Sequence, residues 1–304
     1  MVGRSQRRTL GAGSKECEAL MTDPRNGPYA TLDVAGVEAN ALRMRRDIVS
    51  MIAKAGSGHP GGSLSAADIV ATLYFRVMRH DPSDPEWPGR DRFILSKGHA
   101  APVLYAALAE AGYFGREHLP TLRKLGSILQ GHPDGLKVPG VEVSTGSLGQ
   151  GLAIANGVAL ALRLDGQDEQ RVYVLLGDGE LQEGEIWEAA MFAAHERLSN
   201  LTAIVDDNGL QIDGACDSVM CLGEIAAKFK AFGWLTVEAD GNDVAGLLGA
   251  FENAERLGKD NDLPVVIVAH TTKGRGVSFM ENNADWHGRA PTAQELETAL
   301  EELA

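Results

Sequence analysis

A Gly-Asp-Gly segment, Gly177–Gly179, follows an apolar run in the middle of the chain, and Asn208 follows the next such run. If both runs are parallel strands joined by a helix, their carboxyl ends meet at one edge of a sheet, where open α/β sheets bind ligands. Asp178, Asn208 and a backbone carbonyl near Leu210 would then offer oxygen ligands to Mg²⁺, which often takes further oxygens from phosphates. Gly179 lets the backbone approach such a phosphate closely. A tight turn before a polar strand end explains this pair of segments equally well when the pair is considered alone.

A second glycine-rich segment, Gly146–Gly151, opens a predicted helix that runs to about Leu164. Backbone amide groups at a helix N-terminus attract anions, so this segment is a candidate phosphate site. Glycines that allow close helix packing look the same, and the dinucleotide-binding pattern also needs a strand immediately before the glycines. Residues 141–143 form a poor strand, so this segment is weak evidence by itself.

Four of the eight histidines lie in loops rich in glycine and proline, namely His59, His99, His132 and His287. Such neighbours contribute little to a hydrophobic core, so packing does not explain these four side chains. Imidazoles suit a site that binds polar or anionic ligands and moves protons near neutral pH. The other four lie in or beside predicted helices and strands and are interpreted as structural: His80, His118, His195 and His270.

The elements that would position these residues alternate between strands and helices along most of the chain. Apolar segments typical of strands occur at 92–95, 172–176, 201–205, 234–237 and 265–269. Patterns typical of helices occur at 37–55, 65–78, 184–197, 222–232, 243–257 and 293–303, with a glycine-rich loop between the first two. This alternation predicts an α/β fold, a parallel sheet with helices on both faces. We expect one such domain over residues 36–304, preceded by a loose leader, residues 1–35, whose polar composition is typical of disorder.

Composition and charge exclude several classes of protein. With 304 residues, 44% of them hydrophobic and 23% charged, the chain is neither a fibre nor wholly disordered. It carries 28 basic and 42 acidic residues, and the net charge of −14 argues against binding to nucleic acid or to an anionic membrane. No apolar stretch is long enough to span a bilayer, and the basic N-terminus lacks the apolar segment of a secretory signal. The three cysteines indicate ordinary thiols in a cytoplasmic protein rather than a zinc cluster.

Five separated blocks of sequence combine these glycines and histidines with their neighbours. The blocks are Ser57–Gly61, Asp91–His99, Thr145–Gly151, Gly177–Gly179 with Asn208, and His287–Gly288. Together, and in this order, they resemble transketolase, a thiamine diphosphate enzyme, over residues 40–290. The resemblance implies the thiamine-diphosphate-binding fold for the domain. Ser147 is a departure within the third block, because the family usually has proline there.

The resemblance implies roles for the residues that match the family's motifs. The ligands of a Mg²⁺ or Ca²⁺ ion that bridges the cofactor diphosphate would be Asp178, Asn208 and the carbonyl of Leu210. The contacts of the diphosphate would be Gly179, His99 and His287, and those beside the thiazolium ring would be Gly146 and Leu148. The histidines that bind sugar hydroxyls and relay protons would be His59, His132 and His287. Glu183 matches a carboxylate that communicates between paired active sites, although the helix dipole explains a glutamate in the first turn of a helix equally well.

The implied activity is transfer of a two-carbon ketol unit from a ketose phosphate to an aldose phosphate, as in the pentose phosphate pathway. Family members are considerably longer. Their second domain provides the glutamate that protonates the aminopyrimidine, the aromatic pocket for that ring and most cations that bind the substrate phosphate. Nothing in residues 1–304 corresponds to that domain. The resemblance therefore predicts the N-terminal subunit of a split transketolase, completed by a C-terminal subunit in a heterotetramer, a dimer of heterodimers.

Three alternatives remain open from the sequence. The α subunit of a 2-oxo-acid dehydrogenase also binds thiamine diphosphate through a Gly-Asp-Gly segment and pairs with a second chain, but the blocks around His59, His99 and His132 favour transketolase. A relative dedicated to an unusual sugar phosphate or a sulfosugar would carry the same motifs. A non-catalytic cofactor-binding scaffold is disfavoured, because the motif residues expected in this half are present.

Overall fold

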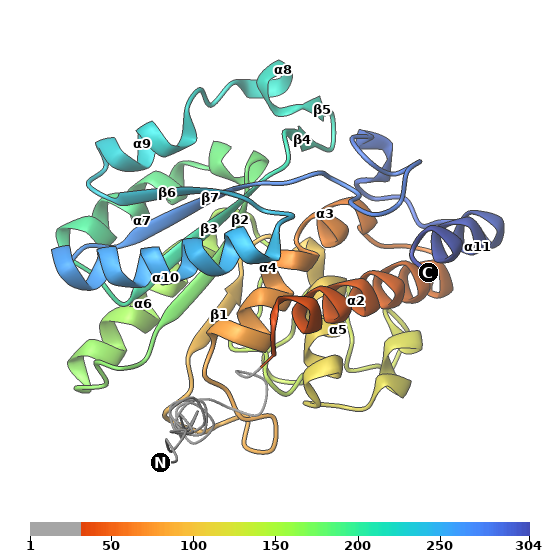
Figure 1. The fold of residues 1–304 in the computed structure, drawn as a ribbon, viewed down its shortest axis with the longest axis horizontal. Helices are drawn as coiled ribbons and strands as arrows, with labels where there is room; N and C mark the ends of the chain where they lie inside the picture. The colour runs from red at the N-terminus through yellow and green to blue at the C-terminus, as the bar shows by residue number, and fades with distance from the viewer. Residues whose placement is uncertain (1–31) are drawn as a thin grey trace, which may run out of the picture.

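Five parallel strands form a sheet at the centre of the fold (Figure 1). In spatial order they are β1 (Arg92–Leu95), β2 (Val172–Gly177), β3 (Leu201–Asp207), β7 (Val265–His270) and β6 (Leu235–Asp240). Every neighbouring pair is parallel, which confirms the predicted fold class. This computed structural model describes residues 32–304, so most of the predicted leader, together with Cys17, lies outside the described residues.

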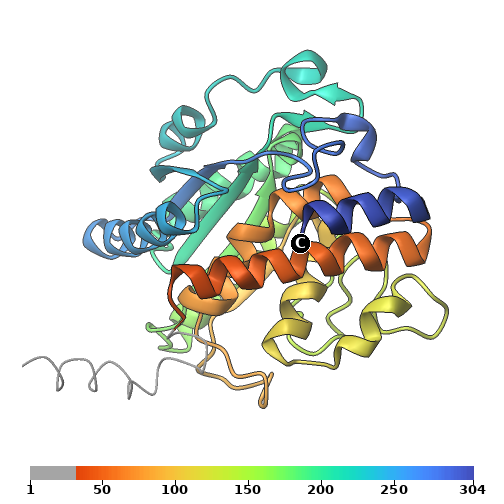
Figure 2. The ribbon, with the colours of Figure 1, turned by 45° about the vertical axis from the view of Figure 1, so that its right-hand side comes forward.

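Helices cover both faces of this sheet (Figures 1 and 2). One face carries α2 (Val34–Ala55), α4 (Ala67–Thr72), α5 (Ala101–Ala111) and α10 (Val244–Asn261), and the other carries α6 (Gln150–Leu164), α7 (Gly184–His195) and α9 (Ile225–Ala231). Successive side chains of a strand point to opposite faces, so Tyr173 and Leu175 of β2 join the first core whereas Val174 joins the second. Burial on both sides explains why the strands are nearly continuous apolar runs.

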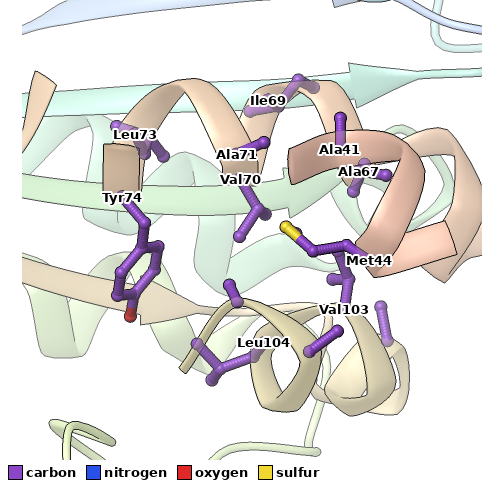
Figure 3. Close-up of a cluster of buried hydrophobic side chains, with 14 of the residues drawn as sticks. Ala41, Met44, Ala67, Ile69, Val70, Ala71, Leu73, Tyr74, Val103 and Leu104 are labelled. Carbon is purple, nitrogen blue, oxygen red and sulfur yellow. The ribbon is translucent and has the colours of Figure 1, made fainter. Parts of the chain in front are cut away.

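Helices α2, α4 and α5 pack together on the first face (Figure 3). Met44 of α2, Val70 of α4 and Val103 of α5 are fully buried in this cluster. The side chain of Asp33 accepts a hydrogen bond from the Gly36 amide at 2.8 Å, and this cap starts α2 before the first residue of the apolar pattern. The helix thus begins and ends close to the predicted limits, and its apolar stripe contributes to the core.

The segment between α2 and β1 differs from the prediction of a glycine-rich loop followed by one helix over 65–78. Helix α3 (Pro60–Ser65) replaces much of the loop, and α4 is followed by a π-helical turn, Leu73–Val77. Gly61 lies inside α3, and a Cβ there would come within 3.0 Å of the Trp286 carbonyl oxygen. The glycine serves close packing rather than a loop, a distinction that a local sequence pattern does not make.

The connection after β3 contains two short elements of structure that the sequence analysis did not predict. A two-stranded antiparallel sheet, β4 (Leu210–Gln211) and β5 (Gly214–Ala215), leads into the short helix α8 (Cys216–Met220). The helix predicted over 222–232 is shorter, since α9 begins only at Ile225. Cys216 and Cys221 are free thiols. Short 3₁₀ helices occupy Gly98–Ala100, Arg116–Thr121, Gly179–Gln182 and Ala284–Trp286.

The last helix, α11 (Ala293–Glu302), lies alongside α2 (Figure 2). It begins with a capping box formed by Thr292 and Glu295. At its other end, Arg46 of α2 donates hydrogen bonds to the carbonyl oxygens of Leu300 and Leu303 at 3.0 and 2.8 Å. Within residues 32–304, no helix is long and apolar enough to cross a membrane.

Replacing Gly151 in the first turn of α6 with alanine is expected to destabilise the fold by about 2 kcal/mol, because the helix touches the end of β1 here. A Cβ at this position would lie 2.2 Å from the Ser96 Oγ and 2.7 Å from its Cα. Gly157 in the same helix is the matched control, since nothing lies within 4 Å of a Cβ placed there. The Gly157→Ala variant is expected to gain about 0.5–1 kcal/mol. Urea unfolding of both variants measures the difference, and equal effects would contradict the prediction.

Candidate functional site

A cavity of about 280 Å³ opens at the carboxyl edge of the sheet. Its lining includes residues that the sequence singled out: His59, His99, Gly146, Leu148, Asp178, Gly179, Asn208, Leu210 and His287. They come from segments far apart in the chain, which the parallel sheet brings together because its carboxyl ends share one edge. The structure therefore gathers these residues in one place, and their roles toward a ligand stay predictions.

Two predicted site residues, His132 and Glu183, do not line this cavity. His132 lies at its margin, where a Cβ on Gly146 would come within 2.9 Å of the imidazole Cδ2. Glu183 is exposed just before α7, and its Cβ would lie 2.8 Å from a Cβ on Gly149. Glu183 is the N-cap residue of α7 rather than part of its first turn, and its side chain accepts no capping hydrogen bond there. The roles of both residues stay predictions.

Three histidine rings from different segments meet in the cavity. The ring centroid of His59 lies 5.2 Å from that of His99 and 5.5 Å from that of His287, and the latter two are 5.1 Å apart. Burial, followed by the positive charge of Arg123, lowers the pKa of His59 to about 4. Burial, followed by the charge of Lys273, lowers the pKa of His287 to about 3, and burial also holds the pKa of His99 well below its usual value. All three imidazoles are therefore neutral at neutral pH and able to accept protons.

The imidazole of His59 is expected to titrate near pH 4 in the folded chain instead of its ordinary 6.5. Between these two values the unfolded chain binds more protons than the folded chain at this group. This group therefore lowers the free energy of unfolding as the pH falls from about 6.5 toward 4, and it has no such effect at higher pH. NMR titration of the histidine ring protons measures the pKa, with His59→Asn identifying the signal. Titration of that signal near its ordinary pH would contradict the expected burial.

Asp178, Asn208 and the carbonyl of Leu210 lie together in the cavity wall at the ends of β2 and β3. The two carboxylate oxygens of Asp178 accept hydrogen bonds from the backbone amides of Gly179 at 2.8 Å and Gly209 at 2.6 Å. The Asn208 Oδ1 accepts one from the Leu210 amide at 3.2 Å. Burial is the main cause that raises the pKa of Asp178 to about 6. The backbone therefore fixes the position of this carboxylate, while burial disfavours its charge.

These oxygen atoms fit a hard divalent cation that is bound through a diphosphate. Carboxylate, amide and carbonyl oxygens are ligands that Mg²⁺ and Ca²⁺ take in proteins. The raised pKa of Asp178 indicates a buried negative charge without full compensation, which a cation would supply. The Leu210 oxygen accepts a hydrogen bond from the Lys273 ammonium at 2.8 Å, so a cation bound there would use its second lone pair or displace that ammonium. Among the described residues no group of three His, Cys, Asp or Glu side chains could hold a metal, so phosphate or water oxygens would complete the coordination.

A buried ion pair supports the floor of the cavity. The ammonium of Lys97 pairs with the carboxylate of Asp206, and the two side chains are 2% and 0% exposed. Lys97 also donates to the Gly62 carbonyl oxygen at 2.8 Å, and Asp206 accepts hydrogen bonds from the hydroxyls of Ser65 and Thr271. The pair thus ties β3 and the segments that follow β1 and β7 to helix α3.

Lys273 is a cavity residue that the sequence reasoning missed. Besides its bond to the Leu210 oxygen, its Nζ lies 3.2 Å from the Nδ1 of His287. Burial, followed by the charge of Lys97, lowers its pKa to about 8. The position of Lys273 in the sequence could have identified it, because it follows a strand closely and precedes a glycine, at the same edge of the sheet as Asp178.

Glu180 is the second charged residue that was missed, and it changes the interpretation of the glycine-rich start of α6. Its carboxylate is 3% exposed and accepts a hydrogen bond from the Gly149 amide at 2.9 Å. A carboxylate of the protein itself therefore occupies the helix N-terminus that the sequence offered as a phosphate site. The segment around Gly179 is left as the better candidate for an external anion.

Comparison with known proteins places the chain among related sequences. Residues 37–304 match the family model described as transketolase, thiamine diphosphate binding domain. The apulose-4-phosphate transketolase subunit of Phocaeicola vulgatus is 42% identical over 273 residues, which are 90% of this chain and 95% of that protein. The 6-deoxy-6-sulfo-D-fructose transketolase subunit SqwG of Clostridium sp. is 44% identical over 267 residues, 88% of this chain and 94% of that protein.

A solved structure supports the same grouping. The transketolase from Leishmania mexicana superposes with a TM-score of 0.84 at 33% identity. The match covers 89% of this chain but only 42% of that one. The chain is thus similar in length to the two subunits and spans less than half of the longer protein.

Proposed function

Because the chain belongs to the transketolase family, whose thiamine diphosphate binding domain it forms, we propose that it is the N-terminal subunit of a two-chain transketolase. It would transfer a two-carbon ketol unit from a ketose phosphate to an aldose phosphate, and only together with a C-terminal subunit. The observation that carries this proposal is the match to a protein that is itself named as one subunit of its enzyme. The match covers 95% of a relative that is named as one subunit of its enzyme, but 42% of a longer transketolase chain.

Thiamine diphosphate with Mg²⁺ or Ca²⁺ is the proposed cofactor. The chemistry that it supplies when bound is cleavage of the ketose carbon–carbon bond and storage of the two-carbon unit. The atoms proposed to hold the cation belong to Asp178, Asn208 and the Leu210 carbonyl. The residues proposed to contact the diphosphate are Gly179, His99 and His287, and those beside the thiazolium ring are Gly146 and Leu148. The raised pKa of Asp178 and the neutral histidines around the cavity support this arrangement.

His59, His132 and His287 are proposed to bind sugar hydroxyls and to move protons during the transfer. A hydroxyl proton needs an acceptor that is neutral at the working pH, and His59 and His287 are neutral there because burial lowers their pKa values, although it also weakens them as bases. The Nδ1 of His59 is buried and has no hydrogen-bond partner within the described part of the chain, so a ligand hydroxyl would satisfy it. Glu183, exposed beside Gly149, is proposed to communicate with the paired active site.

The proposed assembly is a dimer of heterodimers in the cytoplasm, acting on sugar phosphates of the pentose phosphate pathway. The two relatives are named for apulose 4-phosphate and for a sulfosugar, so a pathway dedicated to an unusual sugar is the second candidate. The family match disfavours the α subunit of a 2-oxo-acid dehydrogenase. The buried histidines and Lys273 retained in the cavity disfavour a scaffold without activity.

The purified chain alone is expected to show no ketol transfer, and the C-terminal subunit is expected to restore it. The physical reason is that the residues proposed here contact only the diphosphate and the thiazolium ring of the cofactor, so the partner would have to hold the aminopyrimidine. A coupled assay of aldose phosphate release, with and without thiamine diphosphate and Mg²⁺, measures the activity. Clear turnover by the chain alone would contradict the two-chain proposal. A complete pair that binds the cofactor but stays inert would favour the scaffold.

A further inference from the structure

The carboxylate of Glu180 is buried where three segments of the cavity wall meet. One of its oxygens accepts hydrogen bonds from the Ser96 hydroxyl and, at 2.9 Å, from the Gly149 amide. The other oxygen accepts one from the Gly177 amide at 3.1 Å. The side chain is 3% exposed and lines the cavity from within the segment that carries Asp178. Three donors thus converge on one carboxylate, one from its own segment and two from segments distant in the sequence.

Each of these donors belongs to a part of the chain that contributes to the cavity. Ser96 leads from β1 to His99, and Gly177 ends β2 just before Asp178. Gly149 closes the loop that carries Gly146 and Leu148. The Glu180 carboxylate is therefore a common anchor for the histidine segment, the metal segment and the loop proposed to border the thiazolium ring.

The loop needs this anchor because α6 has no cap of its own. Gly149 stands at the N-cap with a φ of 92°, and no local side chain accepts a hydrogen bond from the first turn. Glu180 accepts a hydrogen bond from the N-cap amide of Gly149 from outside the helix, and its negative charge is favoured at the positive end of a 15-residue helix. The contact between Gly151 and Ser96 holds the same turn sterically, since a Cβ on Gly151 would lie 2.2 Å from the Ser96 Oγ.

We propose that Glu180 is a positioning residue that holds the Gly146–Gly149 loop against the Gly177–Gly179 segment, so that the cavity has the width its cofactor requires. This inference rests on the proposed function for the identity of the cofactor. The anchoring itself is independent of the proposed function, because the hydrogen bonds concerned are present in the chain alone. A carboxylate suits the task because it only accepts hydrogen bonds, whereas a glutamine would turn N–H groups toward one of the three donors.

The anchoring is tested by hydrogen–deuterium exchange of the chain alone, in the Glu180→Gln variant and in Asp91→Asn as the matched control. Asp91 is also 3% exposed, and it accepts hydrogen bonds from two backbone amides, those of Arg79 and Arg171, each at 2.8 Å. Glu180→Gln is expected to speed exchange in peptides that span Gly149 or Gly177. Asp91→Asn is expected to leave those peptides unchanged and to speed exchange near Arg79 and Arg171. Unchanged exchange at both glycines in Glu180→Gln would overturn the proposal.

The effect on the cofactor is tested by titrating the two-chain complex with thiamine diphosphate at fixed Mg²⁺, followed by calorimetry. Glu180→Gln is expected to raise the dissociation constant about tenfold, and Asp91→Asn to leave it unchanged even where its melting temperature falls. Ser96→Ala removes one donor and keeps both backbone bonds, so it is expected to give a smaller rise and serves if Glu180→Gln fails to fold. An equal rise in Asp91→Asn, or none in Glu180→Gln and Ser96→Ala, would overturn the positioning role.

The two proposals fail differently. If the unmodified complex binds no thiamine diphosphate, the proposed function is wrong, and so is the cofactor named here. The exchange result still decides whether Glu180 anchors the loop. The unmodified complex could instead bind the cofactor while the Glu180→Gln variant shows the same hydrogen–deuterium exchange and the same affinity. The proposed function then stands, and the positioning role is wrong.

Discussion

Replacing Asp178 with alanine is expected to abolish metal-dependent binding of thiamine diphosphate to the assembled complex, with the dissociation constant rising by roughly 100-fold or more. The structure gives the reason. Asp178 provides the carboxylate of the proposed ligand set, and the backbone amides of Gly179 and Gly209 hold both of its oxygens in place at 2.8 and 2.6 Å. Calorimetric titration of the complex with the cofactor, with and without Mg²⁺, measures the loss. Unchanged affinity would remove Asp178 from the site.

The melting temperature of the Asp178→Ala variant shows whether the substitution removes a metal ligand or destabilises the fold. Burial raises the pKa of Asp178 to about 6, so the folded chain holds its charged form unfavourably at neutral pH. Its removal is therefore expected to change the melting temperature of the chain little, since the lost backbone hydrogen bonds are offset by the lost charge. Asp165→Ala, at an exposed position after α6, is the control and should alter neither affinity nor stability. A large fall in the melting temperature of Asp178→Ala would assign the residue to the fold instead.

The sheet and the centre of the site could be predicted because local patterns specify them. A strand buried on both faces is an apolar run, as 172–176 is, and the parallel arrangement places the residues after each run at one edge. Asp178 and Asn208 could be brought together on that rule alone, and the structure places both in one cavity. The four glycine-bordered histidines were a weaker signal, and three of them line that cavity.

The parts of the fold and the site that the sequence did not predict depend on contacts between segments that are distant in the sequence. The carboxylate of Glu180 accepts a hydrogen bond from the Gly149 amide, 31 positions away in the sequence. No sequence pattern near α6 indicates that its N-terminal amide bonds to a distant side chain. Gly61 looks like a loop residue, yet it lies in a helix packed closely against the Trp286 backbone. Lys97 was part of a recognised block, but its burial beside Asp206 follows only from the tertiary fold. Local patterns do not encode such pairings.

Replacing Asp206 with alanine is expected to lower the free energy of unfolding by about 3–5 kcal/mol, because it leaves the Lys97 ammonium buried without its anion. The two side chains are 0% and 2% exposed, so water does not replace the lost partner. The hydroxyls of Ser65 and Thr271 would also lose their acceptor. For a domain of this size the expected fall in melting temperature is roughly 10 °C. Urea and thermal unfolding of the chain measure both quantities.

The free energy of unfolding lost in Asp206→Ala arises from the unpaired Lys97 charge rather than from the strength of the ion pair. A double variant distinguishes these two causes. In a Lys97→Met background no ammonium remains to be stranded, so Asp206→Ala should cost at least about 1.5 kcal/mol less than it does alone. Arg256 and Asp260 form the matched surface pair, with side chains 63% and 60% exposed. Their coupling should stay below about 0.5 kcal/mol, because water solvates either charge once its partner is gone. If the coupling free energy of Lys97 and Asp206 were as small as that of the surface pair, the prediction would be wrong, and the buried ion pair would not be what stabilises the floor of the cavity.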